Sequence, residues 1–193
     1  MVLALLDVLA DHGVRAPEAV ASARDPFEVL RYAGTISTEL AEHVEARLRA
    51  NEMEATRTAA AAPHASEVIS AWRNAGRPVA IVSNNSAPAV ETYLSEHGIS
   101  VDHIAARAGA DPSLLKPSPH LITQAVRALD ANAAACALVG DSRTDMTAAR
   151  LAGVAAVGYA NKPGKHEALA DAGADVVIDD MQTLVQAVAI ASA

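Results

Sequence analysis

Two aspartates four residues apart, Asp141 and Asp145, are the side chains in this sequence whose types and spacing best suit metal binding. They follow a short apolar run that stops at Gly140. This pattern predicts a buried strand leading into a helix, with Asp141 just past the strand and Asp145 in the first helical turn. Both carboxylates can then point toward the carboxyl edge of the strand. Mg²⁺ accepts one or two such carboxylates and keeps several waters, although an N-capped helix with acidic residues at its positive end would look the same.

Two further polar clusters precede this pair along the chain. Ser83 and Asn84 follow the apolar run 79–82, and Lys116 begins the sequence Lys-Pro-Ser-Pro. A hydroxyl at a strand end, followed by N–H groups at a helix start, can bind phosphate, and a lysine supplies positive charge for a phosphoryl group. Each residue alone has an ordinary structural interpretation as a cap, a turn former or a solvated lysine. Together with the acidic pair, their order along the chain favours phosphoryl transfer assisted by a metal ion.

In these clusters the sequence resembles the haloacid dehalogenase (HAD) superfamily, in its phosphatase branch with a helical cap. Residues 81–85 look like the second motif of that family, whose hydroxyl residue binds phosphoryl oxygens. Residues 116–119 look like the third motif, whose lysine steadies the nucleophile and the phosphoryl group. Residues 140–145 look like the fourth, acidic motif, which favours a metal-dependent phosphatase over a true dehalogenase.

The resemblance implies a role for each of these side chains. Phosphate binding falls to Ser83, Asn84 and Lys116, and catalysis to Lys116 and Asp141. Mg²⁺ is the implied cofactor, with Asp141 as its ligand and Asp145 binding or orienting it.

The first motif of the family, a strand ending in Asp-x-Asp that supplies the nucleophile and the general acid/base, is not found in this chain. The aspartates that precede Ser83 are Asp7, Asp11 and Asp25. Asp7 follows an apolar run, but Leu9 stands where the second aspartate should be, and the spacing is helical. A weak mimic of the motif by Asp7 is the alternative. We therefore identify no nucleophile and expect the chain as it stands to be inactive.

The first part of the chain, up to about residue 76, reads as helical. Pro17 and Pro26 stand at helix starts, and Ser37 or Thr38 opens a long helix over 39–58. Gly13 ends the first helix, for which we predict an inward face made of the following residues: Leu3, Leu6, Ala10 and Val14.

From Arg77 onward, strands and helices alternate with short connections. The expected strands are 79–82, 103–107, 136–140, 154–158 and 175–178. The expected helices are 64–75, 87–97, 117–129, 144–152, 165–172 and 181–191. This alternation predicts an α/β fold with a doubly wound, Rossmann-like parallel sheet. The resemblance makes it a HAD-like core over residues 61–193, with residues 1–60 as a helical cap lobe whose helices from residue 15 onward cover the carboxyl edge of the sheet.

Composition excludes several classes of protein. The 193 residues carry a formal net charge of −8, which argues against a nucleic-acid binder. Cys136 is the only cysteine, so no intrachain disulfide forms, which fits a reducing cytoplasm. No run is long enough to span a bilayer, and the first residues lack the basic start of a signal peptide. The histidines show no zinc-binding spacing, and no dinucleotide-binding glycine motif occurs.

The leading hypothesis for function is a Mg²⁺-dependent phosphomonoesterase that acts on a small phosphorylated metabolite through an aspartyl-phosphate route. The expected partner is that substrate, with no nucleic acid and no membrane, and a homodimer is left open. The alternative is a non-catalytic HAD-like protein that binds phosphate or another protein, or an enzyme truncated at its amino end.

The resemblance also places the strand of the first motif in mid-sheet, between the strands ending at Ser83 and Gly140. Met1 already begins a helical pattern, so nothing upstream in this chain fills that position. Three solutions are open: the natural chain starts further upstream, the flanking strands pair directly, or a partner donates a strand. We favour the first, because the other motifs stand intact.

Overall fold

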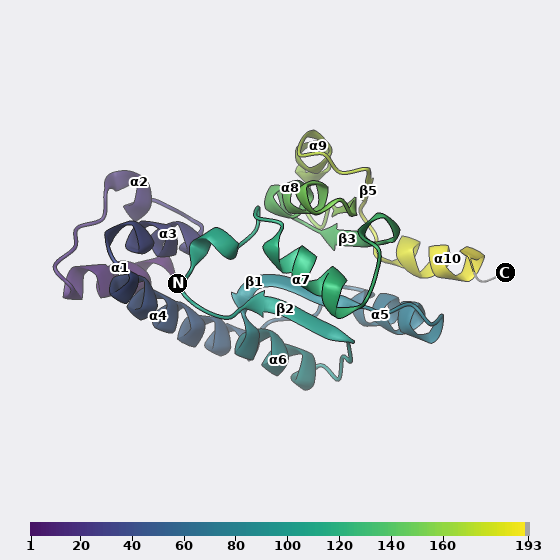
Figure 1. The fold of residues 1–193 in the computed structure, drawn as a ribbon, viewed down its shortest axis with the longest axis horizontal. Coiled ribbons are helices and arrows are strands. Elements are labelled where there is room, and N and C mark those ends of the chain that lie inside the picture. Colours follow the sequence, from purple (N-terminus) through teal and green to yellow (C-terminus); the bar gives the residue numbers. More distant parts are fainter. Residues whose placement is uncertain (192–193) are drawn as a thin grey trace.

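Helices form the first part of the chain, as predicted, in a computed structural model that describes residues 1–191 (Figure 1). In chain order they are α1 Val2–Asp11, α2 Glu18–Ala21, α3 Pro26–Ile36, α4 Thr38–Thr56 and α5 Ala65–Asn74.

Strands and helices then alternate, which confirms the predicted α/β class. The strands are β1 Ala80–Ser86, β2 His103–Arg107, β3 Ala137–Gly140, β4 Ala155–Tyr159 and β5 Val176–Ile178. The helices between and after them are α6 Ala87–Glu96, α7 His120–Ala128, α8 Arg143–Ala152, α9 Lys165–Asp171 and α10 Gln182–Ala191. Two short 3₁₀ turns, η1 Pro112–Leu114 and η2 Ala133–Ala135, precede α7 and β3. None of the helices within residues 1–191 is both long and apolar enough to cross a membrane.

The helices α1, α3 and α4 pack around a hydrophobic core that also includes Leu115. Its fully buried members include Leu5, Leu9 and Leu48. The inward face predicted for the first helix is wrong, because Leu3 is 75% exposed and the buried stripe runs through Leu5 and Leu9. Almost every position of α1 is apolar, so more than one stripe has helical spacing, and contact with α3 and α4 decides which one is buried.

Capping residues start the two long helices of this lobe where the sequence predicts. Asp25 accepts a hydrogen bond from the backbone N–H of Phe27, with Pro26 in the first helical position. Ser37 caps α4 by accepting from the N–H of Leu40 at 3.1 Å. Each cap satisfies an N–H group that the helix itself leaves unpaired.

The strands are all parallel to their neighbours, as predicted, but they form two separate sheets. One sheet has the order β1-β2 and the other β3-β4-β5. The expectation that the strands flanking the absent strand could pair directly is therefore wrong for the described residues. β1 also extends past its predicted end to Ser86, with an irregular register after Ser83.

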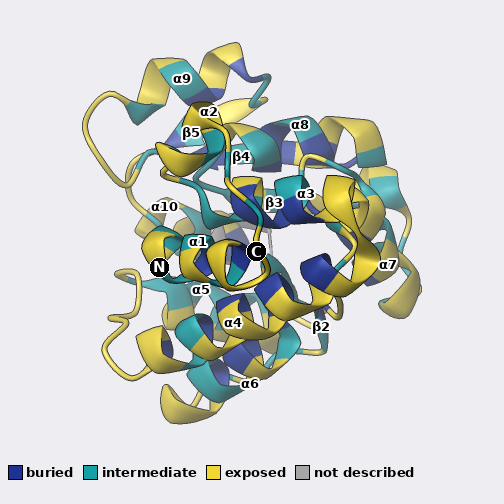
Figure 2. Cartoon of the chain, turned by 90° about the vertical axis from the view of Figure 1, so that its left-hand side faces the viewer, coloured by how far each residue is buried: buried dark blue, intermediate teal, exposed yellow. Residues whose placement is uncertain are grey.

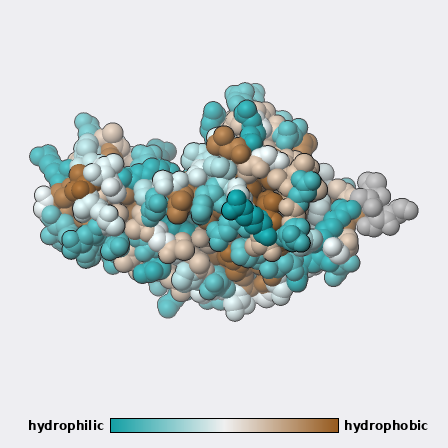
Figure 3. Space-filling model, in the orientation of Figure 1, coloured by the Kyte–Doolittle hydropathy of each residue, from teal (hydrophilic) through white to brown (hydrophobic). Residues whose placement is uncertain are grey.

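Helix α7 connects the two sheets. Leu121 and Ala125 pack against β1 and β2, while Ile122 belongs to the core beneath α8 and β4. The buried side of α7 faces the interior of the protein (Figure 2). By contrast, α2 has no buried residue and α9 buries only Leu169. The surface is hollowed between the helical lobe and the part formed by α8 and α9 (Figure 3).

Candidate functional site

Lys116 lies at the centre of the residues that the sequence singles out. Its ammonium Nζ donates to the backbone carbonyl of Val82 in β1 at 3.1 Å and to Oδ1 of Asp145 in α8 at 2.6 Å. The side chain is only 12% exposed. One lysine thus joins the carboxyl ends of β1 and β3, although these strands belong to different sheets.

Asn84 holds the backbone on which Lys116 sits. Its Oδ1 accepts from the backbone N–H of Lys116 at 2.8 Å, and its Nδ2 donates to the carbonyl of Lys116 at 3.2 Å. These two hydrogen bonds span 32 residues of sequence, and the Lys116–Pro117 peptide bond that follows is cis. The amide of Asn84 therefore positions the lysine and is engaged on both of its polar atoms.

Ser83 lies at the same end of β1, where the ladder with β2 becomes irregular. Its hydroxyl oxygen accepts from the backbone N–H of Asn85 at 3.1 Å. The hydroxyl proton remains available to an oxygen acceptor, because that contact uses Ser83 only as an acceptor. Ser83 thus lies at the same end of β1 as Asn84, which holds the backbone of Lys116.

Asp145 combines a structural and an electrostatic role. Its Oδ2 accepts from the backbone N–H and the hydroxyl of Ser142, at 3.0 and 2.6 Å, in a reciprocal capping box at the start of α8. Its Oδ1 pairs with Lys116. Gly140 makes this packing feasible, because a Cβ there would lie 2.5–2.7 Å from atoms of the Asp145 side chain. Both carboxylate oxygens of Asp145 are consequently in use.

Asp141 is more open than Asp145. Its Oδ2 accepts from Nζ of Lys165 and, at 3.0 Å, from Nδ2 of Asn161, and its side chain is 46% exposed. Partial burial opposes ionisation, but the hydrogen bond and the charge of Lys165, with help from Asn161, hold the pKa of Asp141 below its ordinary value. Lys165 could not be identified from the sequence, because its contact with Asp141 spans 24 residues and follows no motif.

These two aspartates fit a hard divalent cation in donor type. Carboxylate oxygens are suitable ligands, and Mg²⁺ needs only one or two of them. Asp141 could bind such an ion by giving up its contact with Lys165, whereas Asp145 could do so only by releasing Lys116 or Ser142. No group of three or more metal-ligating side chains occurs within the described part of the chain, so water would complete the shell.

A buried ionic cluster ties the helical lobe to the same strand end. Arg107, at the end of β2, pairs with Glu45 and, at 2.6 Å, with Glu52, and all three are almost fully buried. Its Nε also donates to the backbone carbonyl of Asn84 at 3.0 Å. Glu52 accepts from the N–H of Ser86 as well. The cluster, which the sequence analysis did not identify, links α4 to the segment that carries Ser83 and Asn84.

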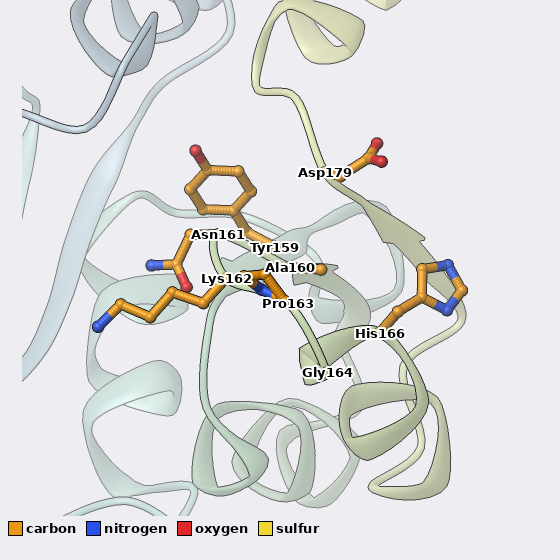
Figure 4. A pocket seen from close by; sticks show the side chains of 8 residues that line it. All are labelled: Tyr159, Ala160, Asn161, Lys162, Pro163, Gly164, His166 and Asp179. Atoms are coloured by element: carbon orange, nitrogen blue, oxygen red, sulfur yellow. The ribbon is translucent and has the colours of Figure 1, made fainter.

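A hollow of about 360 Å³ follows β4, next to Asp141 (Figure 4). Its lining side chains diverge: in the figure, Asn161 and Lys162 project to one side and His166 to the other. Asn161 connects it to Asp141. The loop 161–164 thus borders the candidate site rather than forming a remote turn.

The aspartates that precede Ser83 all lie in the helical lobe. Asp7 and Asp11 are exposed residues of α1, and Asp25 caps α3. The alternative that Asp7 mimics the first motif is wrong, because Asp7 is helical and ends no strand. None of these aspartates stands at the end of a strand, where the first motif would place a nucleophile.

Residues 8–153 match the family of haloacid dehalogenase-like hydrolases. Among curated proteins, the phosphoglycolate phosphatase of Photobacterium profundum is 30% identical over 125 residues, which cover 65% of this chain and 55% of that protein. A plasmid-borne phosphoglycolate phosphatase of Cupriavidus necator is 35% identical over 120 residues, covering 60% of this chain and 50% of that protein. The chain thus spans about half the length of the curated relatives it matches.

Solved structures share the fold over nearly the whole chain. A hydrolase from Pseudomonas syringae superposes with a TM-score of 0.71 at 20% identity, covering 96% of this chain and 88% of that one. A HAD family hydrolase from Deinococcus radiodurans, solved with bound phosphate and sodium, gives a TM-score of 0.62 at 26% identity, with coverages of 98% and 88%. These likenesses confirm the predicted HAD-like α/β fold.

Proposed function

The chain belongs to the haloacid dehalogenase-like hydrolases, and from this we propose that its site binds the phosphoryl group of a small phosphorylated metabolite. The observation that carries the proposal is the position of Lys116, whose ammonium joins the ends of β1 and β3. The ammonium of Lys116, which pairs with Asp145 in the structure, supplies a positive charge that a phosphoryl oxygen would share with that carboxylate. The phosphate bound to the Deinococcus radiodurans hydrolase supports this choice of ligand.

In this proposal the chain's own side chains share the binding. Ser83 donates its hydroxyl to a phosphoryl oxygen, Lys116 supplies the positive charge, and Asn84 fixes the lysine backbone through its two hydrogen bonds. Mg²⁺, held by Asp141 with Asp145 orienting it, would offset the remaining phosphate charge when bound. The relatives named phosphoglycolate phosphatases make phosphoglycolate the first substrate to assay.

Hydrolysis of the phosphomonoester through an aspartyl-phosphate would need a carboxylate nucleophile. Asp7, Asp11 and Asp25 are committed to the helical lobe. The second candidate function is a HAD-like protein that binds phosphorylated ligands without turning them over. A cytoplasmic location is part of the proposal, supported by the single cysteine.

Two measurements on the full chain with Mg²⁺ test these candidates. Calorimetry with inorganic phosphate should show binding that weakens at least about 10-fold in Lys116→Met, which keeps the stem of the lysine but removes its charge. Release of phosphate from p-nitrophenyl phosphate and phosphoglycolate should be absent. Release of phosphate from either compound would establish a phosphatase and refute the prediction that this chain is inactive. Equal affinity for phosphate in the parent protein and in Lys116→Met would refute the proposed phosphate site at Lys116.

A further inference from the structure

Two histidine rings meet between helices α1 and α4 of the helical lobe. His12 follows the last residue of α1, and His43 lies in the second turn of α4. The centroids of their imidazole rings are 4.6 Å apart, and the ring planes are tilted by 47°. The two helices pack against each other at the left of Figure 1. The fold thus brings together positions 12 and 43, which no local motif connects.

Each ring is anchored through Nδ1 to its own helix. Nδ1 of His12 lies 2.8 Å from the carbonyl oxygen of Val8, and Nδ1 of His43 lies 2.8 Å from that of Glu39. A carbonyl oxygen can only accept a hydrogen bond, so each Nδ1 carries the proton. In a neutral ring the other nitrogen, Nε2, then keeps a free lone pair. The two hydrogen bonds therefore fix the same tautomer in both histidines.

The Nε2 atoms of both rings are unused. Among the described residues, no hydrogen bond or ion pair reaches Nε2 of His12 or of His43. Both residues are exposed, and neither belongs to the hydrophobic core of the lobe. Packing in that core therefore does not account for the pair, and both lone pairs are open to a ligand from solvent.

A neutral imidazole held in this way is suited to a transition-metal ion. Imidazole nitrogen is a common ligand of zinc, copper and nickel ions. A histidine that binds a metal almost always donates its other ring N–H to a carbonyl or a carboxylate, which orients the ring. Both rings already make this hydrogen bond. Rings that share one ion must also lie close together, because each nitrogen is about 2.0–2.1 Å from a bound Zn²⁺.

We propose that His12 and His43 together bind one divalent transition-metal ion of the zinc class through their Nε2 atoms, and that this ion links α1 to α4. No group of three or more metal-ligating side chains occurs in the described part of the chain, so water completes the shell. Structural zinc sites have four protein ligands, so a site with two binds more weakly and reversibly.

This site differs in chemistry from the acidic pair Asp141 and Asp145. Carboxylate oxygens suit Mg²⁺, a hard cation, whereas two imidazole nitrogens favour zinc and its neighbours in the transition series. The proposal therefore does not depend on Mg²⁺ or on phosphoryl binding.

Nitrogen NMR of the imidazole rings tests the proposal on the full chain, with Zn²⁺ as the probe. The titration is made at about pH 7.5, where an ordinary imidazole is mostly neutral, and in excess Mg²⁺, which occupies oxygen ligands. The Nε2 signals of His12 and His43 should shift together, with one affinity. His97 is the internal reference. Its Nδ1 also contacts a helix carbonyl, that of Tyr93, but its ring packs on Tyr93 instead of a second histidine.

Glutamine substitutions provide a second, independent measurement. His12→Gln and His43→Gln each remove one ligand, so each should weaken Zn²⁺ binding in calorimetry at least about 10-fold, the loss that follows removal of even an outer partner. His97→Gln is the matched control and should leave the affinity unchanged. Zn²⁺ should also raise the unfolding midpoint of the parent protein, because it binds the folded chain. Either substitution at the pair should abolish this rise.

Three results would overturn the proposal. The first is that neither Nε2 signal shifts at Zn²⁺ concentrations that saturate a weak site. The second is that only one of them shifts, which would mean that a single exposed histidine binds the ion. The third is an equal loss of affinity in His97→Gln, which would mean non-specific binding to surface histidines. Should a variant not fold, the two ring signals of the parent protein decide alone.

Discussion

At the scale of single residues, the two aspartates of the acidic motif differ in how free they are. Asp141 is 46% exposed and holds its partners through one carboxylate oxygen, whereas both oxygens of Asp145 are engaged. We therefore expect Asp141→Asn to weaken Mg²⁺ binding by at least about 10-fold and Asp145→Asn to weaken it less. Isothermal titration with Mg²⁺ measures both. Unchanged affinity in both variants would refute the metal site.

The lysine beside Asp141 provides a prediction about pH. Lys165 keeps the pKa of Asp141 below its ordinary value, so Lys165→Met should raise it, and an NMR titration of the carboxyl carbon would detect the change. A depressed pKa stabilises the fold above the pKa of the unfolded chain, and this contribution is lost as the pH falls through the lowered, folded value. The stability difference between parent and variant should therefore vanish in acid.

Lys162→Met is the matched control for this titration. Lys162 is an exposed residue of the loop 161–164, which precedes Lys165. It should leave the pKa of Asp141 unchanged. An equal rise of that pKa in both variants would show that general surface charge, rather than the contact with Lys165, lowers it.

At the scale of elements, Arg107 holds helix α4 to the ends of β1 and β2. Its side chain is 1% exposed and faces two buried glutamates, Glu45 and Glu52. Arg107→Met would leave the buried Glu52 without a cation and Glu45 with only the half-exposed Arg49, which we expect to destabilise the protein by about 3–5 kcal/mol. Arg49→Met is the control, because Arg49 pairs with the same Glu45 at 3.7 Å from a half-exposed position. It should cost about 0–1 kcal/mol in urea unfolding.

Similar losses of unfolding free energy in Arg107→Met and Arg49→Met would contradict the conclusion that Arg107 is a buried link between α4 and the strands. Addition of phosphate to the folded variants gives a second measurement. Only the loss of Arg107, which donates to the carbonyl of Asn84, should weaken phosphate binding.

The cap of α8 joins helix stability to the site. Ser142→Ala removes a side chain that caps the helix and also holds Asp145. Ser37→Ala removes the equivalent cap of α4, which lies in the helical lobe. Each substitution should lower stability by about 0.5–2 kcal/mol. Only Ser142→Ala should change the affinity for Mg²⁺ or phosphate. Equal affinities in the two variants would show that the cap of α8 does not influence ligand binding.

The sequence was sufficient to predict the elements because their signals are local. Asp25 and Ser37 show where α3 and α4 begin, and the alternation after Arg77 shows the parallel strands. The buried face of α1 was not predictable, because its apolar residues allow several faces and packing partners choose one. The division into two sheets was likewise invisible, since pairing between strands depends on neighbours distant in sequence.

Four residues of the candidate site could be selected from the motifs in the sequence: Ser83, Lys116, Asp141 and Asp145. The polar contacts around these residues could not be predicted from the sequence. Lys165 and Arg107 reach their partners across 24 and 62 residues, and no periodicity or motif records such contacts. Asn84 was selected from its motif, whereas its bonds to the backbone of Lys116 appear only in three dimensions.

At the scale of the whole molecule, two larger hydrophobic cores share no residue. One, around Leu9, joins α1, α3 and α4 and includes Leu115, and the other, around Leu169, lies among α8, α9 and β4. Because the sheets are also separate, we expect the two regions to open independently. Leu9→Ala and Leu169→Ala each remove a fully buried side chain and should cost about 2–5 kcal/mol in the region that contains them.

Native-state hydrogen exchange distinguishes regional from global opening in these variants. Leu9→Ala should accelerate exchange in α1, α3 and α4 while leaving β3 and β4 close to the parent protein. Leu169→Ala should do the reverse. Helix α7, which contacts β1, β2 and α8, sets the limit of this independence, since it packs against the first sheet and against a helix of the second region. Uniform acceleration across the molecule in either variant would show that both regions belong to one cooperative unit.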